Sequence, residues 1–383
     1  MSPPHPPVTF VSSHAEHGGQ EGYLLTLLRA LDPEAVRALV VLRPGPALEE
    51  MSTLGRPLYL VPTSARLGLL PAAVSLRRVL RAQHTEVVHA NGVKAALQAV
   101  LATAGTGVPV VWMKHDCSLD GPLGRRIAAR CRIVVGVSRR VTRTFEGMES
   151  VDVRVVHNGV SIVPPDRQAA RRRLRELLGA PDQDEVVLLV GRIAPGKGQR
   201  EAVEAIPEAL RARPGVRFAF VGGEDSRSRR YGDQVRARVR ALNLERNVAF
   251  LGRQPNAPEL IAGADVLIMP SPHRRGPYGW REGFPLVAAE AMAVGTPVVA
   301  FDEPAVVEAL DGCGELVRAG DSAALGRAVA ALLADPGRLA AMRERGLERA
   351  KALRLEDAVA KMVEIYREAS RSRAGNGTGR ARR

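Results

Sequence analysis

The sequence has little cysteine, and the placement of the few cysteines excludes two classes of protein. Cys117, Cys131 and Cys313 are odd in number and lie far apart in the chain. Disulfide-stabilised domains and zinc modules need paired or closely spaced cysteines. We therefore expect neither a disulfide framework nor a zinc site.

Long apolar runs and nucleic-acid motifs are also missing. No hydrophobic stretch approaches the roughly 20 residues of a membrane span, and residues 1–7 are proline-rich rather than signal-like. Aromatic residues make up 4% of the 383 residues, and no helix-turn-helix or zinc motif accompanies the net charge of +14. We expect a cytoplasmic protein that binds no nucleic acid. Anionic substrates, or peripheral contact with an acidic membrane surface, would explain its basic character.

The sequence does contain a regular alternation of short apolar segments and helical segments, which predicts an α/β protein with two doubly wound parallel sheets. Ligands of such sheets bind at the carboxyl ends of the strands. Asn-Gly and Pro-Pro turns near residues 158–165 indicate a boundary between domains. The predicted parts are residues 1–163, residues 164–354, a last helix over 355–370, and a disordered basic tail over 371–383.

Two carboxylates flank a predicted helix start within residues 280–300. Pro285 suits the first helical turn; Glu282 precedes the helix, and Glu290 lies about one and a half turns inside it. The first backbone N–H groups of a helix favour a phosphate, so Gly283, Phe284, Pro285 and Leu286 at the helix start are candidate donor-binding residues. A phosphate between two carboxylates indicates a sugar nucleotide, because carboxylates accept hydrogen bonds from ribose and hexose hydroxyls. Two solvated glutamates on an amphipathic helix are the alternative.

A basic loop, Gly-Arg-Ile-Ala-Pro-Gly-Lys-Gly over residues 191–198, follows a predicted strand. Arg192 and Lys197 can converge on one diphosphate, the arginine as a fork and the lysine as a point charge. The loop is not a Walker loop, because the lysine is followed by glycine and glutamine. Gly222 and Gly223 end the next predicted strand, where a nucleotide can approach the backbone closely.

The first domain contributes weaker candidates. Gly18 and Gly19 lie between a predicted strand and a helix, where backbone amides can approach an anion. His115 ends another strand and can contact the reacting sugar or the incoming acceptor, unless it is simply satisfied by its neighbours. A metal site at His14 and His17 is disfavoured, because no further ligands lie nearby in the sequence.

The motif running from Glu282 to Ala300, Glu-Gly-Phe-Pro-Leu-Val-x-x-Glu-Ala-Met-Ala-x-Gly-x-Pro-Val-Val-Ala, resembles the signature of the retaining glycosyltransferase family 4. The loop at 191–198 and a Gly-Gly-x-Glu element at 18–21 are similar to the same family. The resemblance implies a GT-B fold, two doubly wound Rossmann-like domains facing a central cleft. The first domain would lie on the acceptor side and the second would bind the sugar nucleotide.

The resemblance also implies roles for single residues. Glu282 would hold the hexose, Glu290 the ribose, the amides of Gly18 and Gly19 the donor phosphate, and the Arg253 loop the base. It implies retention of the anomeric configuration by front-face attack, in which the leaving phosphate oxygen takes the acceptor's proton.

A metal ion is not needed in this scheme. Arg192, Lys197 and the helix start would balance the diphosphate, and such positive groups stabilise a leaving group by a few kcal/mol each. Asp182-Gln183-Asp184 matches the Asp-x-Asp string of metal-dependent glycosyltransferases, but we interpret it as solvated spacing before a strand. We expect no metal and no cofactor, the sugar nucleotide being the substrate.

The chain departs from the family at Ser161, where the family usually has an acid, and in three further places. Asn91 stands where the family often has a second histidine, Asp302 and Glu303 replace a glycine pair, and residues 271–281 form a basic, aromatic insert. The insert either shapes the sugar or acceptor pocket or is an elaboration of the surface. Residues 67–83, with Arg77, Arg78 and Arg81 among leucines, form either a core-facing amphipathic helix or one that rests on an anionic bilayer.

The substrates stay open at this stage. We favour a UDP-sugar over GDP-mannose as donor, and the acceptor hydroxyl belongs to a lipid, a glycan or a small metabolite. A sugar-nucleotide epimerase and a non-catalytic sugar-nucleotide-binding protein are the alternatives. The second is disfavoured because Arg192, Lys197, Glu282 and Glu290 are all intact.

Overall fold

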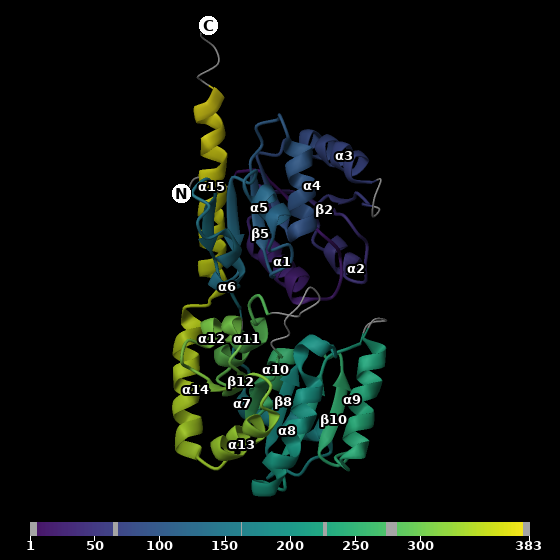
Figure 1. Cartoon of the computed structure of the whole chain (residues 1–383), viewed down its shortest axis with the longest axis vertical. Helices are drawn as coiled ribbons and strands as arrows, with labels where there is room; N and C mark the ends of the chain where they lie inside the picture. Colours follow the sequence, from purple (N-terminus) through teal and green to yellow (C-terminus); the bar gives the residue numbers. More distant parts are fainter. Residues whose placement is uncertain (1–5, 64–67, 162, 225–227, 273–281, 378–383) are drawn as a thin grey trace. The chain divides into compact units, whose positions relative to one another are not determined.

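A computed structural model describes residues 6–63, 68–161, 163–224, 228–272 and 282–377. The chain divides into two compact units, Met1–Gly159 with Leu355–Arg383 (unit 1) and Val160–Arg354 (unit 2). Each unit is a parallel sheet flanked by helices (Figure 1). Most of the predicted insert, residues 273–281, lies outside the described residues.

Unit 1 contains a seven-stranded sheet in the order β3-β2-β1-β4-β5-β6-β7. Its strands are β1 Val8–Ser12, β2 Val36–Val41, β3 Leu58–Leu60, β4 Val87–Asn91, β5 Val110–Lys114, β6 Ile133–Gly136 and β7 Asp152–Val155. Most of these strands are continuous apolar runs, as expected for strands covered on both faces. The strand order reverses between β1 and β4, which pair in parallel from Val8↔Val87 to Ser12↔Asn91. Such a reversal is where doubly wound sheets bind ligands.

The helices of unit 1 include one that arrives from the far end of the chain. They are α1 Gly19–Ala30, α2 Leu48–Ser52, α3 Leu69–Ala82, α4 Val93–Thr103, α5 Pro122–Ala128, α6 Arg139–Thr142 and α15 Leu355–Gly377, with 3-10 turns at Pro33–Ala35 and Arg143–Phe145. Helix α15 packs against α1, β4 and β5. The unit 1 sheet is thus covered in part by residues that follow unit 2 in sequence.

The described end of α15 corrects one prediction. The sequence predicts disorder from residue 371, but the helix continues to Gly377. Extending an existing helix adds a hydrogen bond per residue without a new nucleation step, and arginine and alanine are good helix formers. Residues 378–383 of the predicted tail lie outside the described residues.

Unit 2 contains a six-stranded parallel sheet in the order β10-β9-β8-β11-β12-β13. Its strands are β8 Val186–Val190, β9 Arg217–Val221, β10 Val248–Gly252, β11 Val266–Met269, β12 Val298–Phe301 and β13 Glu315–Val317. The order reverses between β8 and β11, which pair directly at Val187↔Val266 and Leu188↔Leu267. The loops after these two strands are therefore the expected ligand-binding loops of this unit.

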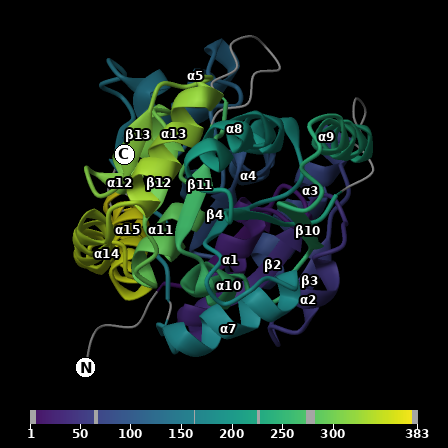
Figure 2. The same cartoon turned by 90° about the horizontal axis from the view of Figure 1, so that it is seen from below.

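Helices cover both faces of the unit 2 sheet. They are α7 Arg167–Leu178, α8 Gln199–Ala212, α9 Arg229–Ala241, α10 Ala257–Gly263, α11 Leu286–Ala293, α12 Pro304–Leu310, α13 Ser322–Leu333 and α14 Pro336–Lys351, with a 3-10 turn at Pro195–Lys197. Figure 2 shows α8 and α13 side by side, in agreement with their extensive contacts. The short elements α12 and β13 are not predicted from the sequence.

Each unit has its own apolar core. In unit 1 the fully buried Trp112 meets Phe145 edge to face, with ring centroids 5.6 Å apart. In unit 2, Phe218, Phe220 and Phe301 are buried among valines and leucines of the sheet and of α8 and α13. Burial of side chains of this size stabilises a fold by roughly 1.5–3 kcal/mol each. No helix in the described ranges combines the length and the hydrophobicity that crossing a membrane requires.

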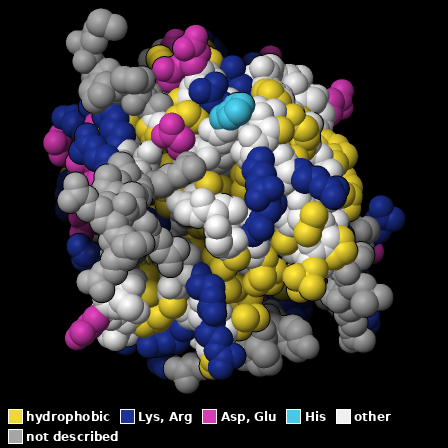
Figure 3. Space-filling model, turned by 90° about the horizontal axis from the view of Figure 1, so that it is seen from above, with side chains coloured by type: hydrophobic (Ala, Val, Ile, Leu, Met, Phe, Trp, Pro, Cys, Tyr) yellow, Lys and Arg dark blue, Asp and Glu magenta, His cyan; other side chains and the backbone are white. Residues whose placement is uncertain are grey.

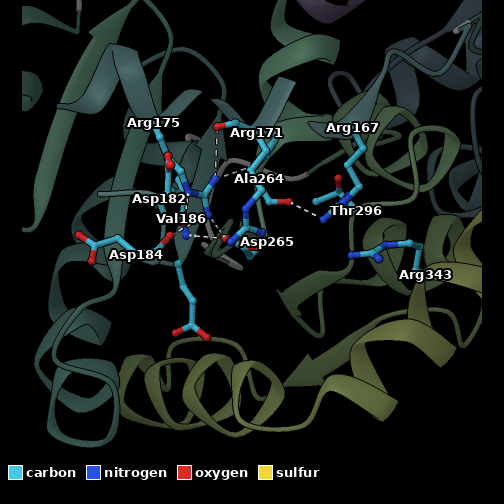
Figure 4. Close-up of polar contacts among 12 residues, drawn as sticks. Arg167, Arg171, Arg175, Asp182, Asp184, Val186, Ala264, Asp265, Thr296 and Arg343 are labelled. Carbon is cyan, nitrogen blue, oxygen red and sulfur yellow. Dashed lines mark hydrogen bonds and ion pairs between the residues drawn. The ribbon is translucent and has the colours of Figure 1, made fainter. Parts of the chain in front are cut away.

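A buried arginine connects α7 to the amino ends of the strands in the unit 2 sheet (Figure 4). Arg175, 2% exposed, donates to Asp265 Oδ2 at 2.9 Å and to the carbonyls of Asp182 and Asp184 at 3.1 and 2.7 Å. The same Asp265 oxygen accepts from the Val186 amide at 2.8 Å. A buried charge is stable only when it is paired and hydrogen-bonded in this way.

The network corrects the interpretation of the Asp-x-Asp string. The Asp184 side chain is 12% exposed and its carboxylate accepts from Arg217 Nε at 2.8 Å, so it is not solvated spacing. It lies just before β8, at the end of the strand opposite to the candidate ligand-binding loops. Asp184 therefore has a structural role at the edge of the sheet.

Replacing Asp265 by alanine should destabilise unit 2 by about 3 kcal/mol, because Arg175 is left as a buried charge without its counter-ion. Differential scanning calorimetry would detect the loss as a lower melting temperature. Glu259→Ala is the matched control, since it removes the partner of the exposed Arg173 at 3.3 Å and should cost less than about 1 kcal/mol. Equal melting temperatures for the two variants would contradict the assigned role of the network.

Candidate active site

The carboxyl ends of β8 and β11 hold a charged pair. Lys197 Nζ lies 2.6 Å from Glu282 Oε1, which also accepts a hydrogen bond from Ser271 Oγ at 3.1 Å. The Glu282 side chain is 6% exposed and the Lys197 side chain 25% exposed. Two predicted site residues, 85 positions apart, thus meet where the strand order reverses.

Close backbone contacts shape the loops around this pair. Gly198 has φ +75°, and a Cβ on it would lie 1.9 Å from the carbonyl oxygen of Pro270. A Cβ on Gly222 would lie equally close, 1.9 Å, to the carbonyl oxygen of Gly191. Only glycine fits at these two positions, since any side chain would push the loops apart. The loops after β8, β9 and β11 therefore touch backbone to backbone.

A residue that the sequence analysis missed fixes the basic loop. Gln199 is fully buried; its Nε2 donates to the Arg192 carbonyl at 2.9 Å and its Oε1 accepts from the Ala194 amide at 3.3 Å. One amide side chain thus closes the loop on both sides of Ile193. The available signal was a glutamine two residues after Lys197, at the start of a predicted helix.

Helix α11 begins beside Glu282. Pro285 is its N-cap and accepts from the amides of Ala288 and Ala289 at 3.0 and 3.4 Å, and Gly283 and Phe284 are buried ahead of it. Leu286, the first helical residue, is half-buried. The structure therefore places the predicted phosphate-binding amides at the start of a helix, where its dipole is positive.

Glu290 lies in the second turn of α11, and its carboxylate forms no hydrogen bond or ion pair with a described residue. Burial raises its pKa above the usual value of 4.5, because an ionised carboxylate loses its hydration there. A hydrogen-bonded ligand such as a pair of ribose hydroxyls would satisfy this group.

Arg192 and Arg253 are exposed residues at the same edge of the sheet, after β8 and β10. Gly223 lies between them: its amide carbonyl accepts from Ile193 at 3.0 Å, and a Cβ built on it would lie 3.8 Å from Arg253 Cβ. The Gly222 amide donates to the Gly252 carbonyl at 2.8 Å. The residues predicted to lie near the nucleotide thus belong to one cluster of loops, and they are Arg192, Gly222, Gly223 and Arg253. Convergence of the two guanidinium groups on one diphosphate stays a prediction.

Unit 1 has a corresponding cluster at its own strand-order reversal. The Asn91 carbonyl, at the end of β4, accepts from Ser13 Oγ at 3.1 Å and from Gln20 Nε2 at 3.1 Å. The Asn91 side chain reaches the next strand end, where its Oδ1 lies 2.7 Å from His115 Nε2. The loop after β1, the end of β4 and the end of β5 are therefore joined through Asn91.

His115 is a neutral ring in this cluster. Burial lowers the pKa of His115 to about 4. The charge of Asp116 raises the pKa in part, and that of Lys114 lowers it slightly further. At neutral pH the ring can accept or donate a hydrogen bond but carries no charge.

The glycine pair forms the start of helix α1, whereas the sequence indicates a loop ahead of the helix. Gly18 is the extended N-cap of α1, and Gly19 is its first residue. His14 Nδ1 lies 2.9 Å from the buried carboxylate of Glu21, at ion-pair distance without hydrogen-bond geometry. In the part of the chain that the structure describes, no three His, Cys, Asp or Glu side chains form a group able to hold a metal ion.

Comparison with known proteins assigns the family. The model for "Glycosyltransferase Family 4" matches residues 17–163, and the model for "Glycosyl transferases group 1" matches residues 170–349. The chain belongs to glycosyltransferase family 4. It is a glycosyltransferase that uses a nucleotide sugar.

Relatives of this family 4 glycosyltransferase include enzymes acting on inositol compounds. The D-inositol 3-phosphate glycosyltransferase of Acidothermus cellulolyticus is 32% identical over 314 residues, 74% of this chain and 67% of the relative. The GDP-mannose-dependent monoacylated alpha-(1-6)-phosphatidylinositol monomannoside mannosyltransferase of Corynebacterium glutamicum is 27% identical over 85% of this chain and 87% of its own length.

Among solved structures, Anabaena HepE in complex with UDP superimposes with a TM-score of 0.81 at 21% identity, covering 94% of this chain and 99% of HepE. Sucrose-phosphate synthase from Thermosynechococcus elongatus gives a TM-score of 0.74 at 21% identity, over 95% and 98% of the two chains. The family and the GT-B fold class predicted from the sequence are thereby confirmed, for two Rossmann-like units with parallel sheets.

The half-buried Glu290 predicts a variant that gains stability. Its pKa is raised in the folded state, so its ionisation opposes folding once the pH exceeds the usual value of 4.5. Glu290→Gln should therefore unfold at a higher urea concentration than the wild type at pH 7, and the difference should vanish below about pH 4.

The exposed Glu344→Gln is the control for loss of one negative charge. If Glu290→Gln were less stable than the wild type at pH 7, the carboxylate would have a stabilising partner, contrary to this account.

Proposed function

We propose that this glycosyltransferase transfers a hexosyl unit from a nucleoside-diphosphate sugar to an acceptor hydroxyl, with retention of the anomeric configuration and without a metal ion. The proposal is carried by the Lys197–Glu282 pair at the strand-order reversal of unit 2. A sugar diphosphate offers each member a better partner, its phosphate oxygens for the lysine and its hexose hydroxyls for the glutamate. The pair would separate as the donor binds.

The remaining groups are assigned to parts of the donor. Arg192 and the amides at the start of α11 would share the diphosphate charge with Lys197, which would stabilise the leaving group without Mg²⁺. Glu290 would accept from the ribose, and Gly222, Gly223 and Arg253 would border the base. The amides of Gly18 and Gly19 and the ring of His115, in unit 1, would contact the donor phosphate and the reacting hydroxyl.

The donor is proposed to be a UDP-sugar, with GDP-mannose as the competing candidate. HepE, a protein of the same fold, binds UDP and UDP-glucose, whereas the Corynebacterium relative is GDP-mannose-dependent. For the acceptor, the names of both relatives contain an inositol phosphate, free in one and lipid-linked in the other. We propose a phosphorylated cyclitol as the acceptor class, in agreement with a net charge of +14.

The purified chain should release nucleoside diphosphate slowly from one of UDP-glucose, UDP-N-acetylglucosamine and GDP-mannose, in EDTA. Lys197→Met should lower the rate by at least about a hundredfold, because losing one preorganised charge at a leaving group costs roughly 3 kcal/mol. Lys351→Met is the control, since this exposed lysine of α14 pairs with the equally exposed Glu348. The anomeric proton of the product, followed by NMR with inositol phosphate as acceptor, reports retention.

Three results would contradict parts of the proposal. Activity that requires added Mg²⁺ would overturn metal independence, and an inverted anomeric centre would overturn retention. An epimerised sugar without transfer would replace the transferase by an epimerase.

Peripheral contact with an anionic membrane is proposed for α3 of unit 1. Leu70 and Val74 are 70% and 50% exposed, whereas Leu76 and Leu80 on the other face are buried. Figure 3 shows a face on which apolar side chains lie among arginines and lysines, with few carboxylates. Apolar and basic residues together are the combination that binds acidic bilayers.

Sedimentation with vesicles tests this contact. The chain should bind vesicles containing phosphatidylserine more strongly than phosphatidylcholine vesicles, and Leu70→Glu should weaken the binding at least about tenfold, through lost burial and charge repulsion. The exposed Leu177→Glu in α7 is the control. Equal binding to both kinds of vesicle, or no effect of Leu70→Glu, would contradict the contact.

A further inference from the structure

Four polar side chains in unit 1 form a line from the last helix to His115. Tyr366 Oη of α15 lies 2.7 Å from His89 Nδ1 of β4, and Asn91 Oδ1 of β4 lies 2.7 Å from His115 Nε2. Tyr366, His89 and Asn91 are each at most 1% exposed. His89 and Asn91 are two residues apart in one strand, so their side chains lie on the same face of the sheet.

The middle of the line contains two unsatisfied atoms. His89 Nε2 and Asn91 Nδ2 are buried and make no hydrogen bond with a described residue. Burial, and to a smaller degree His115, lower the pKa of His89 to about 3, and the neighbouring Asn91 side chain opposes them. Buried polar groups without partners are costly, and a hydrogen bond from Asn91 Nδ2 to His89 Nε2 would satisfy both atoms.

The proton positions along the line follow from which atoms can donate. Asn91 Oδ1 only accepts, so His115 carries its proton on Nε2, and its Nδ1 is left as the acceptor. A hydrogen bond from Asn91 Nδ2, which only donates, would require an unprotonated Nε2 on His89. The proton of His89 would then be on Nδ1 and be donated to Tyr366 Oη.

Aromatic packing leaves the His89 ring little freedom. Its centroid lies 4.8 Å from that of Phe10 and 5.9 Å from that of Tyr366, the latter edge to face. Phe10 in turn meets Tyr366 edge to face at 6.1 Å. The ring is therefore held between β1 and α15.

We propose that Asn91 is a positioning residue that fixes His115 as the Nε2–H tautomer, and that Tyr366, acting through His89, fixes the orientation of the Asn91 amide. The proposal rests on the proposed function in one respect, the contact of His115 with the reacting hydroxyl. In this arrangement the acceptor atom Nδ1 of His115 is available to that hydroxyl. The last helix of the chain thereby determines which ring nitrogen the acceptor site presents.

The first test measures tautomers and needs no turnover. Long-range ¹H–¹⁵N NMR of the full chain at pH 7, with the His115 signals assigned by their loss in His115→Gln, should show the Nε2–H form. In Tyr366→Phe, His89 is free to move its proton to Nε2, which favours a flipped Asn91 amide and shifts His115 towards the Nδ1–H form. Tyr59→Phe is the matched control, because it also removes a tyrosine hydroxyl, one that accepts a hydrogen bond from Gln83 at 2.8 Å.

Variants of Asn91 distinguish a loss of His115 positioning from a general loss of structure. Asn91→Asp keeps an acceptor at the same place and should retain the Nε2 proton on His115, whereas Asn91→Leu should give a mixture of tautomers. With the donor that supports turnover, Asn91→Leu should lower kcat about tenfold, the value of one hydrogen bond, and leave the KM of the donor unchanged.

The outcomes distinguish this proposal from the proposed function. An Nδ1–H tautomer in the wild type, or an unchanged Nε2–H tautomer in both Asn91→Leu and Tyr366→Phe, would overturn the positioning role. A wild type that releases no nucleotide from any donor would overturn the proposed function, while the tautomer measurements would still decide the role of Asn91.

Discussion

Each sheet of this chain has one place where the strand order reverses, so that the loops after two neighbouring parallel strands run in opposite directions. Candidate active-site residues of each unit lie at this place. Between β8 and β11 the loops 191–198 and 270–272 approach each other because no helix crosses between their strand ends. The contact is so close that Gly198 meets the Pro270 carbonyl without room for a side chain. Ser271, the residue after Pro270, donates to Glu282, which places the carboxylate beside Lys197.

The two ends of the unit 2 sheet use the same kinds of charge differently. At the amino-terminal edge, Arg175 has acceptors on Asp265, Asp182 and Asp184, so its donors are largely used within the protein. At the carboxyl edge, Lys197 is a quarter exposed and can exchange its carboxylate partner for a phosphate. An arginine whose donors are used within the protein stabilises the fold, whereas a partly exposed lysine can respond to a ligand.

The sequence predicted what depends on local pattern. The alternation of apolar and helical segments indicated two parallel sheets, and the motif from Glu282 to Ala300 located the start of α11. The elements α12 and β13 escaped because short segments carry too little periodicity. The disorder expected at residues 371–377 failed because helix extension overrode the glycine-rich composition.

Contacts between distant segments were not predictable in the same way. Gln199 looked like an ordinary polar residue until the fold placed its amide across the basic loop. The Asp184 carboxylate looked solvated because its partner, Arg217, lies 33 residues further along the chain. Family resemblance supplied the candidate residues, but only the three-dimensional structure shows which of them touch.

The line from Tyr366 to His115 shows why such distant contacts carry information about chemistry. Tyr366 and His89 are separated by 277 residues, and burial lowers the pKa of His89 to about 3 and that of His115 to about 4. Both rings are therefore neutral at pH 7, and no charge is exchanged along the line. A neutral imidazole has one donor and one acceptor, so fixing either nitrogen fixes the other. The last helix therefore influences the strand end through the orientation of hydrogen bonds. Uncharged side chains can maintain that orientation in a buried place without the desolvation cost of an ion.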